Sequence, residues 1–218
     1  MTDDRKPAEL PSIDHLHRAV DRLQELDRIL GWIGQERGWK PEALRALQVG
    51  WGNFNLPVRG DRFIFGMHDE HGQLVNLRGY MPTSSIKTVG LRGRPVMLWP
   101  CPERTWPTSQ EIWLVEGEAD AIAARSAWPL TGVTSVPGAA TWKADFARRL
   151  ARYARVHVLV DADDAGDMLA DRAVHDLAAA GAHYELHHWT DFAGPVPDKY
   201  DLTDWIRDHP HEIGPPID

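Results

Sequence analysis

Two short apolar runs along the chain are each followed directly by acidic residues. The first run, 112–115, leads into Glu116, and the second, 156–160, leads into Asp161. Both have the length and β-branched content of buried strands, and near-continuous apolar strands are typical of parallel sheets covered on both faces. Ligands of open parallel sheets bind at the carboxyl ends of the strands. The pattern therefore predicts that these carboxylates share one rim of one sheet.

Strands and helices alternate around these two runs. The predicted strands are 112–116, 131–136, 156–161 and 183–189. The predicted helices between them are 119–127, 140–153 and 166–180. A series of this kind favours an α/β fold with a parallel sheet and right-handed crossovers.

The first half of the chain has a different pattern. Ser12 can cap a helix whose apolar positions continue to Leu30, where Gly31 and Gly34 are expected to loosen or end it, and a second helix is predicted at 41–48. Strands at 62–67 and 73–80 flank a turn at 69–72 and predict an antiparallel hairpin.

These elements divide the chain into four segments. We predict a disordered N-terminus at 1–11, a helical lead-in at 12–50, a basic α+β subdomain at 51–106 and an α/β domain at 107–218.

Charge and composition narrow the class of protein. Residues 1–110 carry 15 basic and 13 acidic side chains, whereas residues 111–218 carry 9 and 19. A single cysteine excludes an internal disulfide or a cysteine-based zinc ribbon in these residues. The charged N-terminus has no apolar signal-peptide region, and no apolar stretch reaches membrane-spanning length, so a cytoplasmic location is the default expectation.

The acidic residues after the strands have the spacing of a metal site. Glu116 and Asp120 lie one helical turn apart, and Asp161 and Asp163 point the same way on an extended chain. Clustered carboxylates repel each other and are tolerated when a cation lies between them, and hard oxygen ligands suit Mg²⁺ or Mn²⁺. Each motif alone is also explained by acids that favour a helix N-terminus or by an exposed acidic loop. Asp201 can extend the site, although helix capping explains it equally well.

The sequence has two other possible interpretations. An EF-hand calcium loop starting at Asp161 fails, because Arg172 stands where that loop needs glutamate. Ten tryptophans suggest base stacking on single-stranded DNA. Most have core-like patterns, and Trp99, Trp106 and Trp142 are the better candidates to face a nucleotide.

Taken together, four motifs give the second half a family resemblance. They are VEGEAD at 115–120, VPGAATW at 136–142, VDADDAG at 160–166 and KYDLTDW at 199–205. In order and spacing they resemble a Toprim domain, and more narrowly the Toprim domain of bacterial, phage and plasmid DNA primases. Segment 62–87 resembles, more loosely, the basic subdomain that precedes Toprim in primases, and residues 36–50 resemble its helical lead-in.

The resemblance implies a fold and a set of residue roles. The fold is a Rossmann-like, mostly parallel α/β domain behind a helical lead-in and a small basic α+β subdomain. Glu116, Asp161 and Asp163 would bind divalent metal and carry catalysis, with Asp120 as the second acid of the first motif. Asp201 matches a later acidic position seen in several primases. Three basic residues would position template and incoming nucleotide: Arg62, Arg78 and Lys87.

The expected function is synthesis of short RNA primers from nucleoside triphosphates on single-stranded DNA, with Mg²⁺ or Mn²⁺. The 218 residues show neither the Cys/His zinc module nor the helicase P-loop of full primases, so a helicase or template-recognition partner in trans is expected. A Toprim nuclease and a non-catalytic Toprim adaptor stay open as alternatives. A nucleotide-sugar transferase would not need the Glu116 motif, and a topoisomerase would need a further domain that carries a tyrosine nucleophile.

Overall fold

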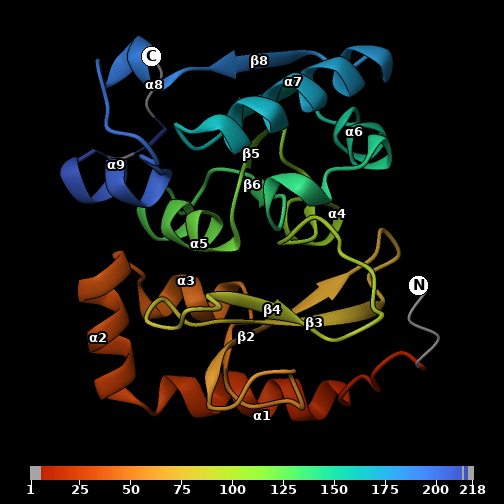
Figure 1. The fold of residues 1–218 in the computed structure, drawn as a ribbon, viewed down its shortest axis with the longest axis vertical. Helices are drawn as coiled ribbons and strands as arrows, with labels where there is room; N and C mark the ends of the chain where they lie inside the picture. Colours follow the sequence, from red (N-terminus) through yellow and green to blue (C-terminus); the bar gives the residue numbers. More distant parts are fainter. Residues whose placement is uncertain (1–5, 213, 216–218) are drawn as a thin grey trace.

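Two four-stranded sheets organise the chain, one above the other in Figure 1. The structure is a computed structural model, and it describes residues 6–212 and 214–215. The first sheet is antiparallel and the second is parallel.

Three helices precede the first sheet. They are α1 (Ile13–Gln24), α2 (Asp27–Arg37) and α3 (Pro41–Ala46). The prediction of one helix from Ser12 to Leu30 was wrong, because α1 ends at Gln24 and a second helix, α2, begins at Asp27. The break lets Leu23 of α1 and Ile33 of α2 enter the same core. Gly31 and Gly34 lie inside α2.

The antiparallel sheet has the order β1-β2-β3-β4. Its strands are β1 (Gly50–Gly52), β2 (Arg62–His68), β3 (Leu74–Tyr80) and β4 (Thr88–Gly90). The predicted hairpin is confirmed, since Phe63 pairs with Tyr80 and the pairing continues to the turn. In that turn, Asp69 accepts hydrogen bonds from the backbone N–H groups of His71 and Gln73 at 3.0 and 2.8 Å.

The second sheet has the order β6-β5-β7-β8, and all its pairs are parallel. Its strands are β5 (Glu111–Val115), β6 (Val133–Ser135), β7 (Arg155–Leu159) and β8 (Tyr184–His187). The helices of this half are α4 (Pro102–Thr105), α5 (Glu118–Ala127), α6 (Ala144–Leu150), α7 (Asp164–Ala179), α8 (Trp189–Phe192) and α9 (Leu202–Asp208). The helix expected at 140–153 is instead a 3-10 turn (Ala139–Thr141) followed by α6.

Alternate residues of the central strands face two different cores. Ile112 and Leu114 pack with α6 and α7 on one face of the parallel sheet. Trp113 and Val115 pack with α5 and α9 on the other face. Helices on both faces explain why these strands are apolar throughout.

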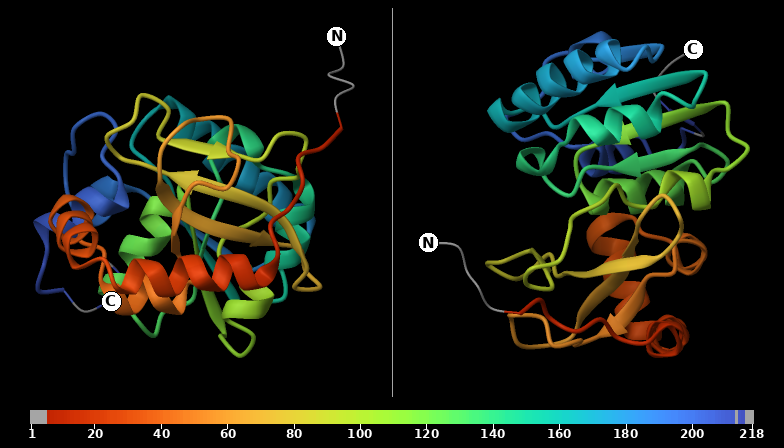
Figure 2. Two further views of the ribbon diagram at one scale, coloured as in Figure 1. Left: turned by 90° about the horizontal axis from the view of Figure 1, so that it is seen from below. Right: turned by 90° about the vertical axis from the view of Figure 1, so that its right-hand side faces the viewer.

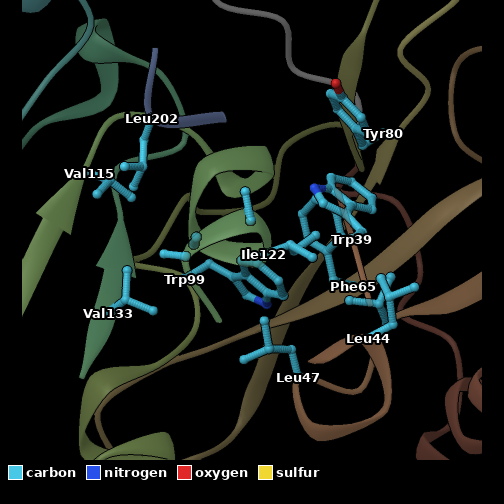
Figure 3. Packing of buried hydrophobic residues seen from close by; sticks show 14 of the residues in the cluster. Trp39, Leu44, Leu47, Phe65, Tyr80, Trp99, Val115, Ile122, Val133 and Leu202 are labelled. Carbon is cyan, nitrogen blue, oxygen red and sulfur yellow. The ribbon is translucent and has the colours of Figure 1, made fainter. Parts of the chain in front are cut away.

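The second of these cores continues into the antiparallel sheet. Figure 3 shows Phe65 and Trp39 from the first half next to Ile122 of α5, with Val115 and Leu202 of the same cluster to the left. Helix α1 lies on the opposite side of the antiparallel sheet, away from the parallel sheet (Figure 2). The two halves therefore share one hydrophobic core at their junction.

The N-terminal segment 1–11 was expected to be disordered. Its first five residues lie outside the described ranges. In the described part, the Ala8 N–H donates to the Arg92 carbonyl at 3.0 Å, and Arg94 Nε donates to the Ala8 carbonyl at 2.7 Å. Residues 6–11 form no helix or strand, but these two hydrogen bonds of the Ala8 backbone hold the segment against the loop after β4.

Candidate metal centre

Glu116 and Asp161 lie just beyond the ends of adjacent parallel strands. Strands β5 and β7 pair in register from Glu111 with Arg155 to Leu114 with Val158, so both acids reach the same rim of the sheet. The Glu116 carboxylate accepts a hydrogen bond from the backbone of Asp161. The prediction that the two acidic motifs meet at one rim agrees with this geometry.

Asp120 lies in the first turn of α5 and is almost completely buried. Thr203, at the start of α9, donates to Asp120 Oδ1 from its hydroxyl at 2.8 Å and from its backbone N–H at 3.3 Å. Gly117 leaves room for this carboxylate, because a Cβ there would lie 2.9 Å from Asp120 Oδ2. The absence of a side chain at position 117 therefore allows Asp120 to turn toward the strand ends.

Asp163 caps helix α7. Its Oδ1 accepts hydrogen bonds from the backbone N–H groups of Ala165 and Gly166, both at 2.9 Å. Gly166 packs directly on the end of β7, since a Cβ at this position would lie 2.1 Å from the Asp161 carbonyl oxygen. This close packing fixes the start of α7 beside the carboxylates. The pKa of Glu116 is raised mainly by burial and, to a smaller extent, by the negative charge of Asp163.

Asp201 caps α9 and also faces the site. Its Oδ1 accepts the Asp204 N–H at 2.7 Å, and its Oδ2 lies 3.9 Å from the Arg37 guanidinium of α2. The sequence did not indicate Thr203 or Arg37 as partners of the carboxylates. Both lie far along the chain from the acids that they contact, and no local pattern links them.

Four of the carboxylates have raised pKa values. Burial, followed by the charge of Asp120, raises the pKa of Asp161 to about 9. Burial and the charge of Asp201 raise the pKa of Asp120 to about 7. Burial also raises the pKa values of Glu116 and Asp201. For these four groups, burial and neighbouring acids outweigh the nearby positive charge.

The donor set has the chemistry of a divalent-cation site, although among the described residues no three of these side chains bring ligand atoms within 4.8 Å of one another. All five side chains offer carboxylate oxygens, which are the ligands of Mg²⁺ and Mn²⁺. Glu116 Oε2 is buried without a hydrogen-bond partner among the described residues. Within the same residues, Arg37 is the one basic side chain that forms an ion pair with the cluster. An added cation would supply the missing positive charge and the missing partner.

The three basic residues expected near the template lie in different settings. Lys87 is exposed just before β4. Arg78 Nε lies 2.5 Å from Glu118 Oε1 in a buried ion pair between β3 and the first turn of α5. Arg62 is 3% exposed, and it donates to the Ile86 and Lys87 carbonyls at 2.8 and 3.1 Å. Its placement fits support of the loop that carries Lys87 better than direct contact with nucleic acid.

The tryptophans are core residues. Trp99 and Trp142, the better candidates to face a nucleotide, are 2% and 8% exposed and therefore do not form a stacking surface. Trp106 is half-buried, donates from Nε1 to the Val133 carbonyl at 2.7 Å, and has the Arg125 guanidinium over its ring at 4.8 Å. The indole rings pack between the sheets and helices. The spacing of tryptophans in the sequence alone could not distinguish this core packing from a surface that stacks on bases.

Comparisons with known proteins agree with this architecture. Residues 111–189 match the family model of the Toprim domain. A comparison with curated proteins found no match.

Solved structures resemble most of the chain. The zinc-binding and RNA polymerase domains of the Aquifex aeolicus primase match with 19% identity and a TM-score of 0.65, covering 92% of this chain and 59% of that one. The primase fragment of the bacteriophage T7 primase-helicase protein matches with 18% identity and a TM-score of 0.61, covering 82% and 70%. A DnaG primase catalytic domain bound to single-stranded DNA matches with 17% identity and a TM-score of 0.61, covering 89% and 75%.

These findings define the class of protein. The chain contains a Toprim domain, and it has the fold of a DnaG-type primase catalytic core. It spans 59% of the Aquifex fragment, and at these identities the likeness shows the fold alone. No helix in the described ranges is long and apolar enough to cross a membrane.

Proposed function

We propose that this chain is a primase-like nucleotidyltransferase that joins ribonucleotides into short primers on single-stranded DNA. The observation that carries the proposal is the cluster of one buried and four half-buried carboxylates, short of positive charge, at the strand ends of a Toprim domain. The likeness to primase catalytic cores, one of them bound to single-stranded DNA, supports the same direction.

The carboxylates would hold the metal ions. Glu116, Asp161 and Asp163 provide the oxygens at the rim, and Asp120 and Asp201 extend the set toward α9. When bound, Mg²⁺ or Mn²⁺ lowers the pKa of an attacking 3′-hydroxyl and stabilises the charge of the leaving pyrophosphate. Thr203 keeps one oxygen of Asp120 in a fixed hydrogen bond, and Arg37 offsets part of the charge of Asp201.

The antiparallel sheet would contribute to template and nucleotide binding. Lys87 is exposed and free to attract phosphate. Arg78 acts through its ion pair with Glu118, which joins β3 to the helix that carries Asp120. We propose that Arg62 acts indirectly, by shaping the loop before β4.

Partners are proposed on the same basis. The T7 match comes from a primase-helicase protein, and the Aquifex match includes a zinc-binding domain. We therefore propose a helicase or a template-recognition module as a partner of this core, with single-stranded DNA and nucleoside triphosphates as its substrates.

The test is a primer-synthesis assay. Purified protein is incubated with single-stranded DNA, labelled nucleoside triphosphates and Mg²⁺ or Mn²⁺. The double variant Asp161→Ala/Asp163→Ala removes the proposed ligands, and Asp171→Asn, an exposed acid on α7, is the matched control. We expect short labelled oligomers from the wild type and the control, and none from the double variant.

Other outcomes separate the rivals. Shortened DNA without new labelled product would identify a nuclease that uses the same carboxylates. If neither labelled oligomers nor shortened DNA form with either metal, the result contradicts primase activity of this chain on its own. If the double variant makes oligomers as well as the wild type does, Asp161 and Asp163 are not required for primer synthesis.

A further inference from the structure

A second group of metal-binding side chains lies on the parallel sheet, apart from the carboxylates. The group consists of His157 on β7 and of Glu185 and His187 on β8. Each residue offers one ligand atom, and these three atoms lie within 4.8 Å of one another. His157 Nδ1 is 2.9 Å from His187 Nε2 and 3.9 Å from Glu185 Oε2. The group therefore brings two imidazoles and one carboxylate together.

The two imidazole rings are held in place by packing. His157 and His187 are 1% and 6% exposed. The Trp113 ring stacks on both, with centroid distances of 4.7 and 5.0 Å and interplanar angles of 12° and 17°. Glu185 is about half exposed, so this side of the group is open to solvent. The two imidazoles are therefore held rigidly in the core, and the Glu185 carboxylate gives solvent access to the group.

A carboxylate also orients the first imidazole. Glu111 Oε2 lies 3.2 Å from His157 Nε2, so in the tautomer that donates Nε2–H to this carboxylate the Nδ1 lone pair faces His187 and Glu185. Metal-binding histidines usually donate their second ring N–H to a carboxylate or carbonyl in this way.

We propose that His157, His187 and Glu185 form a binding site for a zinc-type transition metal ion. Two imidazoles and one carboxylate are a known zinc ligand set, which leaves a fourth position for solvent. The set differs from the oxygen-only cluster at the strand ends, which suits Mg²⁺ or Mn²⁺. Tetrahedral zinc separates its ligand atoms by about 3.3 Å, so on binding the imidazoles would part slightly and the half-exposed Glu185 side chain would move closer.

Arg155 competes with the metal for this site. Its guanidinium lies 3.1 Å from Glu185 Oε2 and 3.8 Å from Glu111 Oε1. A bound ion takes over Glu185 while Arg155 keeps Glu111 as a partner. Replacing this arginine by glutamine therefore strengthens metal binding. A purely structural histidine pair would not respond in that direction.

The proposed ion would tie the edge strand of the sheet to its neighbour. β8 pairs with β7 alone among the described strands, and it is the only strand of this sheet that follows α7. One ligand comes from β7 and two from β8, so the ion would cross-link them. Binding to the folded state alone raises stability with metal concentration.

The test uses tag-free, full-length protein stripped of metal. Co²⁺ is titrated in excess Mg²⁺ and followed by its visible absorption, which is intense when nitrogen and oxygen ligands surround it tetrahedrally. Zn²⁺ then competes against the bound Co²⁺. We expect one Co²⁺ per chain, displaced by Zn²⁺ and retained in the Asp161→Ala/Asp163→Ala variant.

Four further variants decide the assignment. Glu185→Gln, at an exposed position, should weaken Co²⁺ binding at least tenfold, and His187→Gln should abolish the absorption. Arg155→Gln should strengthen binding, and His175→Gln, an exposed histidine on α7, should leave it unchanged. The proposal is overturned by an absent visible band, by unchanged binding in Glu185→Gln, or by loss of the band only when Asp161 and Asp163 are replaced. None of these outcomes depends on primer synthesis, so the proposed function can fail independently.

Discussion

Replacing Asp161 by asparagine should stabilise the metal-free protein while it removes a proposed metal ligand. Burial and the surrounding acids raise the pKa of Asp161 from 3.8 to about 9. A raised pKa in the folded state means that the folded protein binds this proton more tightly than the unfolded chain does. The free energy of unfolding therefore falls as the pH rises from about 4 to about 9.

The size of the effect follows from the linkage. At pH 7 the medium is about three pH units above the pKa of the unfolded chain, and each unit corresponds to about 1.4 kcal/mol. The upper limit is therefore about 4 kcal/mol, and partial solvent access reduces the expected gain to about 2 kcal/mol. For a chain of this length, such a gain raises the melting temperature by about 4–8 °C.

Thermal unfolding in EDTA measures this gain. Asp161→Asn should melt above the wild type at pH 7, and the difference should shrink as the pH falls toward 4. Mg²⁺ should raise the melting temperature of the wild type and have little effect on the variant. The exposed control Asp171→Asn should differ from the wild type by less than about 0.5 kcal/mol. An Asp161→Asn protein that melts at or below the wild type in EDTA would refute the reasoning.

Three other substitutions probe the supports of the site. Thr203→Val removes the 2.8 Å hydrogen bond to Asp120 and should weaken Mg²⁺ binding by about tenfold, measured by calorimetric titration; an unchanged affinity would contradict this. Glu118→Ala leaves Arg78 buried without its partner and should cost about 3 kcal/mol in urea unfolding, and adding Arg78→Ala should recover part of the loss rather than double it. Gly166→Ala forces a Cβ onto the end of β7 and should cost about 3 kcal/mol, whereas wild-type stability would show that α7 shifts freely.

The sequence was sufficient for the elements that depend on local pattern. The apolar runs before Glu116 and Asp161 became β5 and β7, because central parallel strands are apolar on both faces. The acidic residues that follow could be assigned to one rim, because parallel neighbours end at the same edge. The Toprim resemblance rested on these positions, and the family match covers them.

The supports of the site could not be derived in this way. Asp201 is paired with Arg37 of α2, a helix that begins 174 residues before Asp201 in the chain. Thr203 and Asp120, which are hydrogen-bonded, are 83 residues apart. Contacts of this kind depend on how the layers stack. The buried setting of Arg62 follows from the same cause, because β2 is covered on both sides by helices and a loop instead of alternating between core and solvent.

The core shared by the two sheets has a practical consequence for dissecting this protein. Ile122 of α5 packs in the same cluster as Phe65 of β2 and Trp39 before α3 (Figure 3). An excised Toprim fragment would present this apolar surface to water and would tend to associate or unfold. The two halves should therefore melt in a single cooperative transition, and cleavage of a surface loop should leave both fragments bound to each other.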